Sequence, residues 1–213
     1  MDILGVDINW LGHSGFKIRG EKIIYIDPFQ VTSDKIAGEK ADLLLITHEH
    51  YDHCSIADIK NIIKPETIIV TVADCQSKLS GLPVANVTLM TPRQKVDIQG
   101  TRIETVPAYN LNKRFHPKEN EWVGFIVTIN GKRIYHAGDS DATPEMKALT
   151  GIDIALVPVS GVYVMTPEEA AAIVNIFKPK VAIPIHWGNP NVMGKHSDAE
   201  KFKNLVKGEV VIL

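Results

Sequence analysis

Residues 43–53 read Leu-Leu-Leu-Ile-Thr-His-Glu-His-Tyr-Asp-His, an apolar run that leads directly into a cluster of histidines. The apolar run is typical of a short strand that is buried on both faces. Side chains alternate along an extended chain, so His48 and His50 point to the same side, and the following turn can return Asp52 and His53 toward them. Imidazoles and a carboxylate at this density are suited to binding Zn, Fe or Mn. The segment therefore predicts a metal site at the end of a buried strand.

A solvated polar turn that is rich in histidine is the alternative interpretation of this cluster. It has little structural use, because neighbouring imidazoles repel one another when they become charged. A helix is expected over residues 55–63, with Ser55 as its N-cap and Asp58 three residues later. The positive end of that helix lies beside the cluster and favours carboxylate ligands and anionic substrates. The metal-site interpretation is therefore preferred.

The composition is that of an ordinary globular protein. The chain has 213 residues, of which 45% are hydrophobic and 23% charged, so we expect one compact domain over residues 1–213 and no dominant disorder. The longest apolar runs, such as residues 43–46 and 152–159, are interrupted and far shorter than the roughly 18–20 residues of a membrane span. A net charge of −2 without a Lys/Arg cluster argues against a broad nucleic-acid surface. No signal peptide is visible, and Cys54 and Cys75 make no disulfide framework, so a cytoplasmic location is expected.

The remaining sequence predicts two β-rich halves with amphipathic helices that cover them, which suggests stacked sheets between helical layers. Asn130-Gly131 predicts a tight hairpin, because both residues of a type I′ turn need positive φ angles. Thr166, Pro167 and Glu169 predict a capped helix start. The expected strands are 3–10, 15–18, 22–27, 43–47, 67–71, 87–90, 95–98, 102–107, 123–129, 132–136, 153–159, 181–185 and 209–213. The other expected helices are 74–79, 144–149, 166–177 and 197–206, the last with Ser197 as its N-cap.

The histidine cluster is one of several motifs whose order resembles the metallo-β-lactamase superfamily. His48-x-His50-x-Asp52-His53 is similar to its H-x-H-x-D-H motif. Further matches are Tyr135-His136-Ala-Gly-Asp139-Ser140, Pro184-Ile-His186-Trp-Gly188, Trp10-Leu-Gly-His13-Ser-Gly and Ile26-Asp27-Pro28. The last two resemble the branch that includes ascorbate-phosphate lactonase-like proteins and phospholipase D-type enzymes acting on N-acylethanolamine phospholipids. The resemblance covers nearly the whole chain and implies an α/β fold, a four-layer αββα sandwich.

The resemblance also implies a ligand set for two metal ions. His48 and His50 would hold the first ion, while Asp52 and His53 would hold the second ion. The second ion would also take His186, and Asp139 would bridge the two.

The third ligand of the first ion has two candidates. The superfamily places a histidine soon after a strand equivalent to residues 102–107, where this chain has Asn110. Either the loop folds back so that His116 coordinates, or Asn110 takes the position and the first site is weaker. We favour His116, because imidazole binds borderline metals better than a neutral amide does.

Other polar residues near these motifs have competing interpretations. His136 either positions the metal ligands through hydrogen bonds, which is the preferred interpretation, or is a hydrogen-bonded histidine of the core. His13 touches the substrate or is a simple turn residue. Cys54 is expected to be a small buried filler rather than a ligand. Lys113 and Arg114 attract an anionic substrate or are solvated loop charges. His196 is expected to be solvated.

These ligands exceed what one tetrahedral zinc can use, so a dinuclear centre is the economical interpretation. We expect two divalent transition-metal ions, zinc or manganese, with iron as the alternative. A hydroxide bridging the metals would cleave an ester, lactone or phosphodiester bond in a small, anionic substrate. Asp52, His136 and His13 are the residues assigned to the catalytic step. No Gly-x-Ser-x-Gly elbow supports serine hydrolase chemistry.

Two other functions fit the same motifs. Iron-dependent redox enzymes use this scaffold, although no flavodoxin-like appendage is present here. A non-catalytic metal-binding protein is the other, and the full ligand set argues against it. A tRNA-processing nuclease would be expected to carry an RNA-gripping arm, which is not evident. Nothing in the sequence specifies an oligomeric state.

Overall fold

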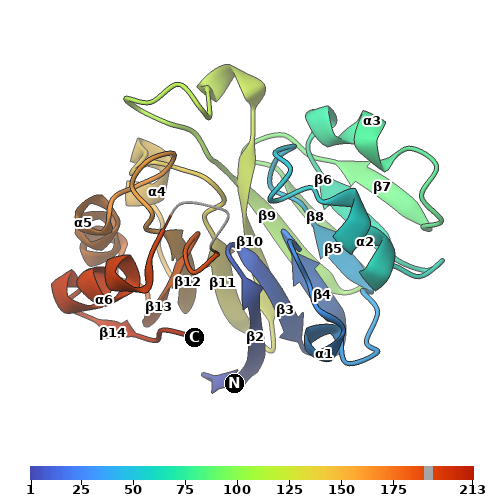
Figure 1. Ribbon diagram of the computed structural model, residues 1–213, viewed down its shortest axis with the longest axis horizontal. Helices are drawn as coiled ribbons and strands as arrows, with labels where there is room; N and C mark the ends of the chain where they lie inside the picture. The colour runs from blue at the N-terminus through green and yellow to red at the C-terminus, as the bar shows by residue number, and fades with distance from the viewer. Residues whose placement is uncertain (190–193) are drawn as a thin grey trace. The chain divides into compact units, whose positions relative to one another are not determined.

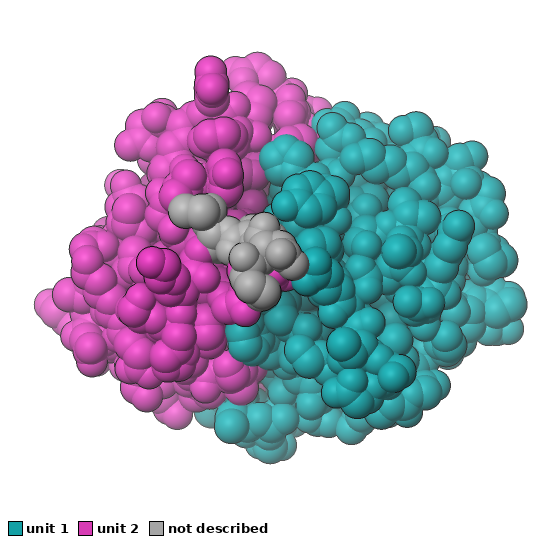
Figure 2. Space-filling view, in the orientation of Figure 1, with its two compact units in different colours: residues 1–91 teal, residues 92–213 magenta. Residues whose placement is uncertain are grey.

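The computed structural model describes residues 1–189 and 194–213, in two compact units, Met1–Thr91 and Pro92–Leu213 (Figures 1 and 2). Each unit is built on its own seven-stranded sheet. Among the described residues, no helix has both the length and the apolar character needed to cross a membrane.

The sheet of the first unit follows the order of the chain. Its first four strands are antiparallel neighbours, and β4 to β7 are parallel neighbours. Strand β5 is buried along its whole length, as its apolar run predicts. The strand expected at residues 3–10 is wrong in one respect, because Leu4 and Gly5 adopt φ angles of 55° and 82° and divide it by a turn. The strands are β1 (Asp2–Ile3), β2 (Val6–Gly12), β3 (Gly15–Arg19), β4 (Ile23–Ile26), β5 (Leu43–Leu45), β6 (Ile68–Thr71) and β7 (Asn86–Leu89).

The helices of the first unit are short. The predicted helix after the histidine cluster is confirmed as α2, and the Ser55 hydroxyl accepts a hydrogen bond from the backbone N–H of Asp58. Helix α1 was not predicted, because four residues carry too little periodicity to recognise. The helices are α1 (Ser33–Ile36), α2 (Ile56–Ile62), the 3-10 helix η1 (Ala73–Cys75) and α3 (Gln76–Leu79).

The sheet of the second unit repeats this pattern, with β8 to β11 antiparallel and β11 to β14 parallel. The predicted hairpin between β10 and β11 is confirmed, since Asn130 and Gly131 have φ angles of 51° and 72°. The strands are β8 (Lys95–Ile98), β9 (Thr101–Pro107), β10 (Val123–Ile129), β11 (Lys132–His136), β12 (Ile154–Pro158), β13 (Val181–Ile185) and β14 (Glu209–Val210).

Among the helices of the second unit, α5 packs against α6. The capping box of Thr166 and Glu169 is confirmed. The expected N-cap Ser197 is wrong. Helix α6 begins at His196, because the Asp198 carboxylate accepts a hydrogen bond from the backbone N–H of Lys195. The helices are η2 (Lys118–Asn120), α4 (Pro144–Lys147), α5 (Pro167–Phe177) and α6 (His196–Leu205).

Strand directions place the predicted site residues at one edge of each sheet. In the first unit β2, β4 and β5 run the same way, so the segments that follow them leave from the same edge. In the second unit β9, β11, β12 and β13 share a direction in the same manner. Polar side chains commonly collect beyond the carboxyl ends of such strands. Each unit therefore gathers its own set of polar side chains at one edge.

Candidate metal centre

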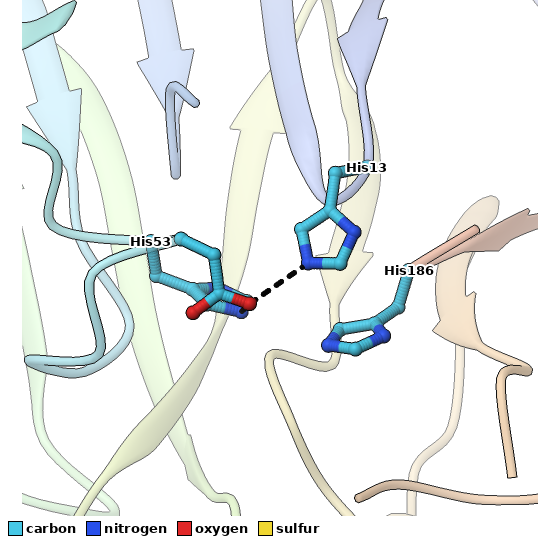
Figure 3. Close-up of side chains that lie close together, drawn as sticks. His13, His53 and His186 are labelled. Atoms are coloured by element: carbon cyan, nitrogen blue, oxygen red, sulfur yellow. Dashed lines mark hydrogen bonds and ion pairs between the residues drawn. The ribbon is translucent and has the colours of Figure 1, made fainter. Parts of the chain in front are cut away.

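The candidate metal-binding residues form one group in each unit, and we call the group of the first unit the first ligand set: His13, His48, His50, Asp52 and His53. His13, labelled in Figure 3, follows β2, and its Nε2 lies 3.1 Å from Oδ2 of Asp52. One ligand atom each of His13, Asp52 and His53 lies within 4.8 Å of the other two. All three side chains are buried. A carboxylate and two imidazoles thus converge on a small volume.

The remaining imidazoles of this set stack closely. His48 Nε2 lies 3.1 Å from His50 Nδ1, and the ring of His48 lies 4.1 Å from that of His53. Three imidazoles in contact would repel one another if they were all protonated. As a neutral ring each keeps one nitrogen lone pair, and such a lone pair is the ligand that imidazole offers to a borderline metal ion.

Asp27 orients residues of this set through hydrogen bonds to Thr47 and His53. It is fully buried, follows β4, and accepts hydrogen bonds from the backbone N–H and hydroxyl of Thr47 at 2.8 and 2.6 Å. Its Oδ2 also lies 2.7 Å from Nδ1 of His53. The Thr47 hydroxyl donates its proton to Asp27, so it accepts from Nδ1 of His48 at 2.9 Å. His48 and His53 therefore hold their protons on Nδ1 and offer Nε2 as a ligand atom.

The second unit carries the second ligand set, which consists of His116, Asp139 and His186. Oδ2 of Asp139 lies 3.3 Å from Nε2 of His116 and 3.1 Å from Nε2 of His186. All three side chains are buried. His186 follows β13, as Figure 3 shows, Asp139 follows β11, and His116 lies in the loop after β9.

Hydrogen bonds to Nδ1 also fix the rings of the second set. The Asn110 amide oxygen lies 3.0 Å from the backbone nitrogen of His116 and 3.2 Å from its Nδ1, so His116 carries its proton there. Ser160 Oγ lies 2.8 Å from Nδ1 of His186. Nε2 of His116 is then an acceptor that faces a carboxylate oxygen. Two acceptors in contact need a proton or a metal ion between them, so the donor chemistry of this set fits a metal.

Several of these residues have a left-handed backbone. His13, Asp27 and His186 have φ angles of 53°, 42° and 62°, which L-residues adopt at a cost in free energy. Gly194 passes so close to His186 that an added Cβ would lie 2.5 Å from its carbonyl oxygen. Such backbone strain is common at functional sites, and these three residues belong to the ligand sets or contact them.

The other predicted residues have distinct environments. His136 is buried, and its Nδ1 accepts a hydrogen bond from the backbone N–H of Gly138 at 3.1 Å, in the turn before Asp139. Cys54 is buried, in agreement with the prediction. A hydrogen bond from Cys75 lowers the pKa of the Cys54 thiol, while the same contact and burial raise the pKa of Cys75. His196 is exposed on α6, as expected.

Of the two cationic loop residues that were considered for attracting an anionic substrate, only Arg114 is exposed and Lys113 is paired with a carboxylate. Lys113 Nζ lies 2.7 Å from Oδ1 of Asp141, which compensates its charge, while Arg114 is exposed. Sequence reasoning missed the roles of Thr47, Ser160 and the Asn110–His116 contact. The Asp-Pro pair after β4 was the one signal that pointed to Asp27.

Comparison with known proteins agrees with this geometry. Residues 7–186 match the family described as the Beta-lactamase superfamily domain. The chain is 35% identical to a UPF0173 metal-dependent hydrolase of Thermococcus onnurineus, with 98% of this chain and 96% of that protein covered. A crystal structure of a candidate metal-dependent hydrolase from Parabacteroides distasonis is 31% identical, with a TM-score of 0.83 and coverage of 97% and 92%.

A more distant structure shares the fold. Igni18, a metallo hydrolase of the archaeon Ignicoccus hospitalis, superposes with a TM-score of 0.77 at 23% identity, covering 98% of this chain and 94% of that one. The predicted α/β class and the metallo-β-lactamase fold are thereby confirmed. The chain belongs to the β-lactamase superfamily domain family and is a metal-dependent hydrolase of the metallo-β-lactamase superfamily.

Proposed function

We propose that the two ligand sets together bind two divalent transition-metal ions, zinc or manganese, with iron as the alternative. The observation that carries this proposal is the shared state of the ligand imidazoles. In His116 and His186, Nδ1 lies against a polar side-chain oxygen, and Nε2 faces the carboxylate of Asp139. His48 and His53 repeat the contact at Nδ1. Such support from behind is typical of metal-binding histidines.

The proposed assignment follows the order of the motifs. His48, His50 and His116 hold the first ion, and Asp139 bridges the two. Asp52, His53 and His186 hold the second ion. In this proposal residues 1–213 act as one metallo-β-lactamase-like domain, which the family match supports because it spans residues from both units.

The substrate class that we propose is a small molecule with an ester, lactone or phosphodiester bond. Two divalent ions supply Lewis acidity and lower the pKa of a shared water toward neutrality. Asp52 and Asp139 balance the charge of the ions. The imidazole of His13 holds the Asp52 carboxylate in position, and it is the proposed contact to the substrate. His136 stabilises the turn that presents Asp139.

The anionic character of the substrate has weaker support, because Asp141 compensates Lys113 and leaves Arg114 as the exposed loop cation. The buried thiols of Cys54 and Cys75 fit a reducing compartment, and we propose a cytoplasmic location.

The test is metal analysis of the full chain followed by an activity screen. Protein purified without chelator should contain close to two transition-metal ions per chain. His50→Ala and His186→Ala should each lower that content, while His196→Ala, an exposed histidine outside both sets, should not. The loaded protein is then screened against lactones, phosphodiesters and thioesters. A content that stays at one ion under metal supplementation contradicts the dinuclear proposal. Iron-only loading with dioxygen consumption and no hydrolysis would support the redox alternative.

A further inference from the structure

Two loops of the second unit carry exposed apolar side chains, and one of these residues, Phe115, directly precedes His116 in the chain. We define the apolar lip as Leu111, Phe115, Val162 and Tyr163. Leu111 is 56% exposed, Phe115 38% and Val162 42%. Large apolar side chains that are exposed singly are ordinary, but a group of them marks a binding surface. These four come from two loops, one after β9 and one after β12, which leave their sheet at the same edge.

Contacts hold the two loops together. The rings of Phe115 and Tyr163 meet edge to face, with centroids 4.7 Å apart. The Asn110 side chain connects the lip to the ligand, since its Nδ2 donates to the Tyr163 carbonyl at 3.1 Å and its Oδ1 accepts from the His116 backbone. The backbone N–H of Asn110 donates to the His116 carbonyl at 2.8 Å. The lip is thus formed before any ligand arrives, which lowers the entropic cost of binding.

The polar groups of the same loop are already used. Asp141 accepts a hydrogen bond from the backbone N–H of Leu111 at 2.9 Å and pairs with Lys113 at 2.7 Å. The carboxylate of Glu169 also lies 3.8 Å from the Lys113 ammonium. The loop therefore presents two exposed apolar side chains, Leu111 and Phe115, together with the exposed Asn112 and Arg114.

We propose that the apolar lip binds an alkyl or aryl portion of the substrate while the scissile group lies at the ligand sets. The inference rests on the proposed function, because it takes His116 as a metal ligand. Phe115 is the residue before His116 in the chain. A substrate whose polar end binds the metal can therefore place its apolar end against the apolar lip. The lip thereby selects substrates with an extended apolar group over small hydrophilic ones.

The test uses methyl-, butyl- and octylphosphonate, whose common head group binds metal and whose chains differ only in length. Binding to the metal-loaded full chain is measured by titration calorimetry. Each methylene that is fully buried on binding raises the affinity about fourfold, and each methylene that is partly buried raises the affinity about twofold. Octylphosphonate should therefore bind at least about tenfold more tightly than methylphosphonate.

Variants assign that preference to the lip. Phe115→Gln combined with Leu111→Gln should reduce the ratio between octyl and methyl to less than about threefold, while Phe115→Leu should keep most of it. Ile176→Gln is the matched control, since Ile176 is an exposed apolar residue of α5 in the same unit. Metal content, measured for every variant, shows whether His116 still coordinates.

The outcomes separate the inference from the proposed function. Equal affinity for the three phosphonates overturns the inference alone, as does a chain-length preference that the lip variants leave unchanged. Self-association of the chain that the lip variants abolish, without a chain-length preference, also overturns it, because the lip would then bind a second copy. Failure of every phosphonate to bind a chain that carries two metal ions overturns the proposed catalytic site and this inference with it.

Discussion

Asp27 and His53 form a carboxylate–imidazole pair that is completely shielded from solvent, with 2.7 Å between Oδ2 and Nδ1. The carboxylate cannot rotate away, because Thr47 donates two further hydrogen bonds to it. A buried carboxylate without a lysine or arginine partner is costly unless it is fully hydrogen-bonded. Here three hydrogen bonds, two from Thr47 and one from His53, offset that cost, and they fix the orientation of an imidazole that we propose as a metal ligand.

Asp27→Asn should weaken metal binding, because a neutral amide holds the His53 imidazole less firmly than the carboxylate does. The His53 imidazole also becomes a weaker metal ligand. The expected loss is about 10–100-fold in affinity. Competition with a chromophoric chelator measures it. Asp153→Asn is the control, since Asp153 is a buried carboxylate that bonds the backbone of Arg133 in the second unit. That change should alter the melting temperature and leave metal affinity unchanged. Equal metal affinity in wild type and Asp27→Asn would contradict the orienting role.

Asp139 and His136 should differ sharply in their effects, although they lie in one short segment. Asp139→Ala removes the carboxylate that both His116 and His186 face, so at least one metal ion and nearly all hydrolysis should be lost. His136→Ala removes a hydrogen bond in the turn before it, and should keep most of the metal while lowering affinity or rate about 10–100-fold. Metal analysis and steady-state rates decide between them. An empty site in His136→Ala with both sites filled in Asp139→Ala would reverse the assignment.

Stability should fall in acid partly through Glu39. Hydrogen bonds from Arg19 and Lys17 hold the pKa of the Glu39 carboxyl below its ordinary value of about 4.3. A lowered pKa in the folded state contributes stability that is fully present above the ordinary value and is lost as the pH falls through the folded one. In urea unfolding, Glu39→Gln should therefore destabilise the protein at pH 7 and have a smaller effect near pH 3. The exposed Glu21→Gln is the control, and an effect of Glu39→Gln that does not vary with pH would contradict the argument.

Local signals account for the parts of the fold that the sequence predicted well. The caps at Ser55 and Thr166 and the Asn130-Gly131 turn each depend on a few neighbouring residues, and all three are confirmed. The two wrong predictions, the strand at residues 3–10 and the N-cap at Ser197, each failed because another local feature determined the structure. The turn at Leu4 divides a continuous apolar pattern, and the Asp198 carboxylate starts α6 before Ser197.

The site divides in the same way. His48 to His53 lie in one motif, so their spacing alone indicated a ligand cluster. The partners at Nδ1 could not be predicted, because Asp27 and Ser160 are brought to their histidines by strand pairing and not by sequence proximity. His116 was uncertain for a related reason, since its position depends on how the loop after β9 folds.

His116 and Asn110 form the contact on which the last prediction depends. Asn110 Oδ1 accepts from the backbone of His116 and lies 3.2 Å from its Nδ1, so the amide oxygen is engaged in holding the ring. The same side chain donates to the Tyr163 carbonyl. In the proposed assignment, His116 therefore coordinates the metal and Asn110 supports its ring.

His116→Ala should then empty the first metal site while the second stays filled, whereas Asn110→Ala should keep both ions and lower affinity about 10–100-fold, the range for a residue that orients a ligand. Binding of Co²⁺ followed by its absorption spectrum reports the loss of one imidazole ligand in His116→Ala and an unchanged ligand count in Asn110→Ala. His196→Ala controls for the removal of an imidazole, because His196 is exposed on α6. If Asn110→Ala empties the site and His116→Ala leaves it filled, the amide is the ligand. The loop would then position Asn110, and the apolar lip would lose its connection to the metal through His116.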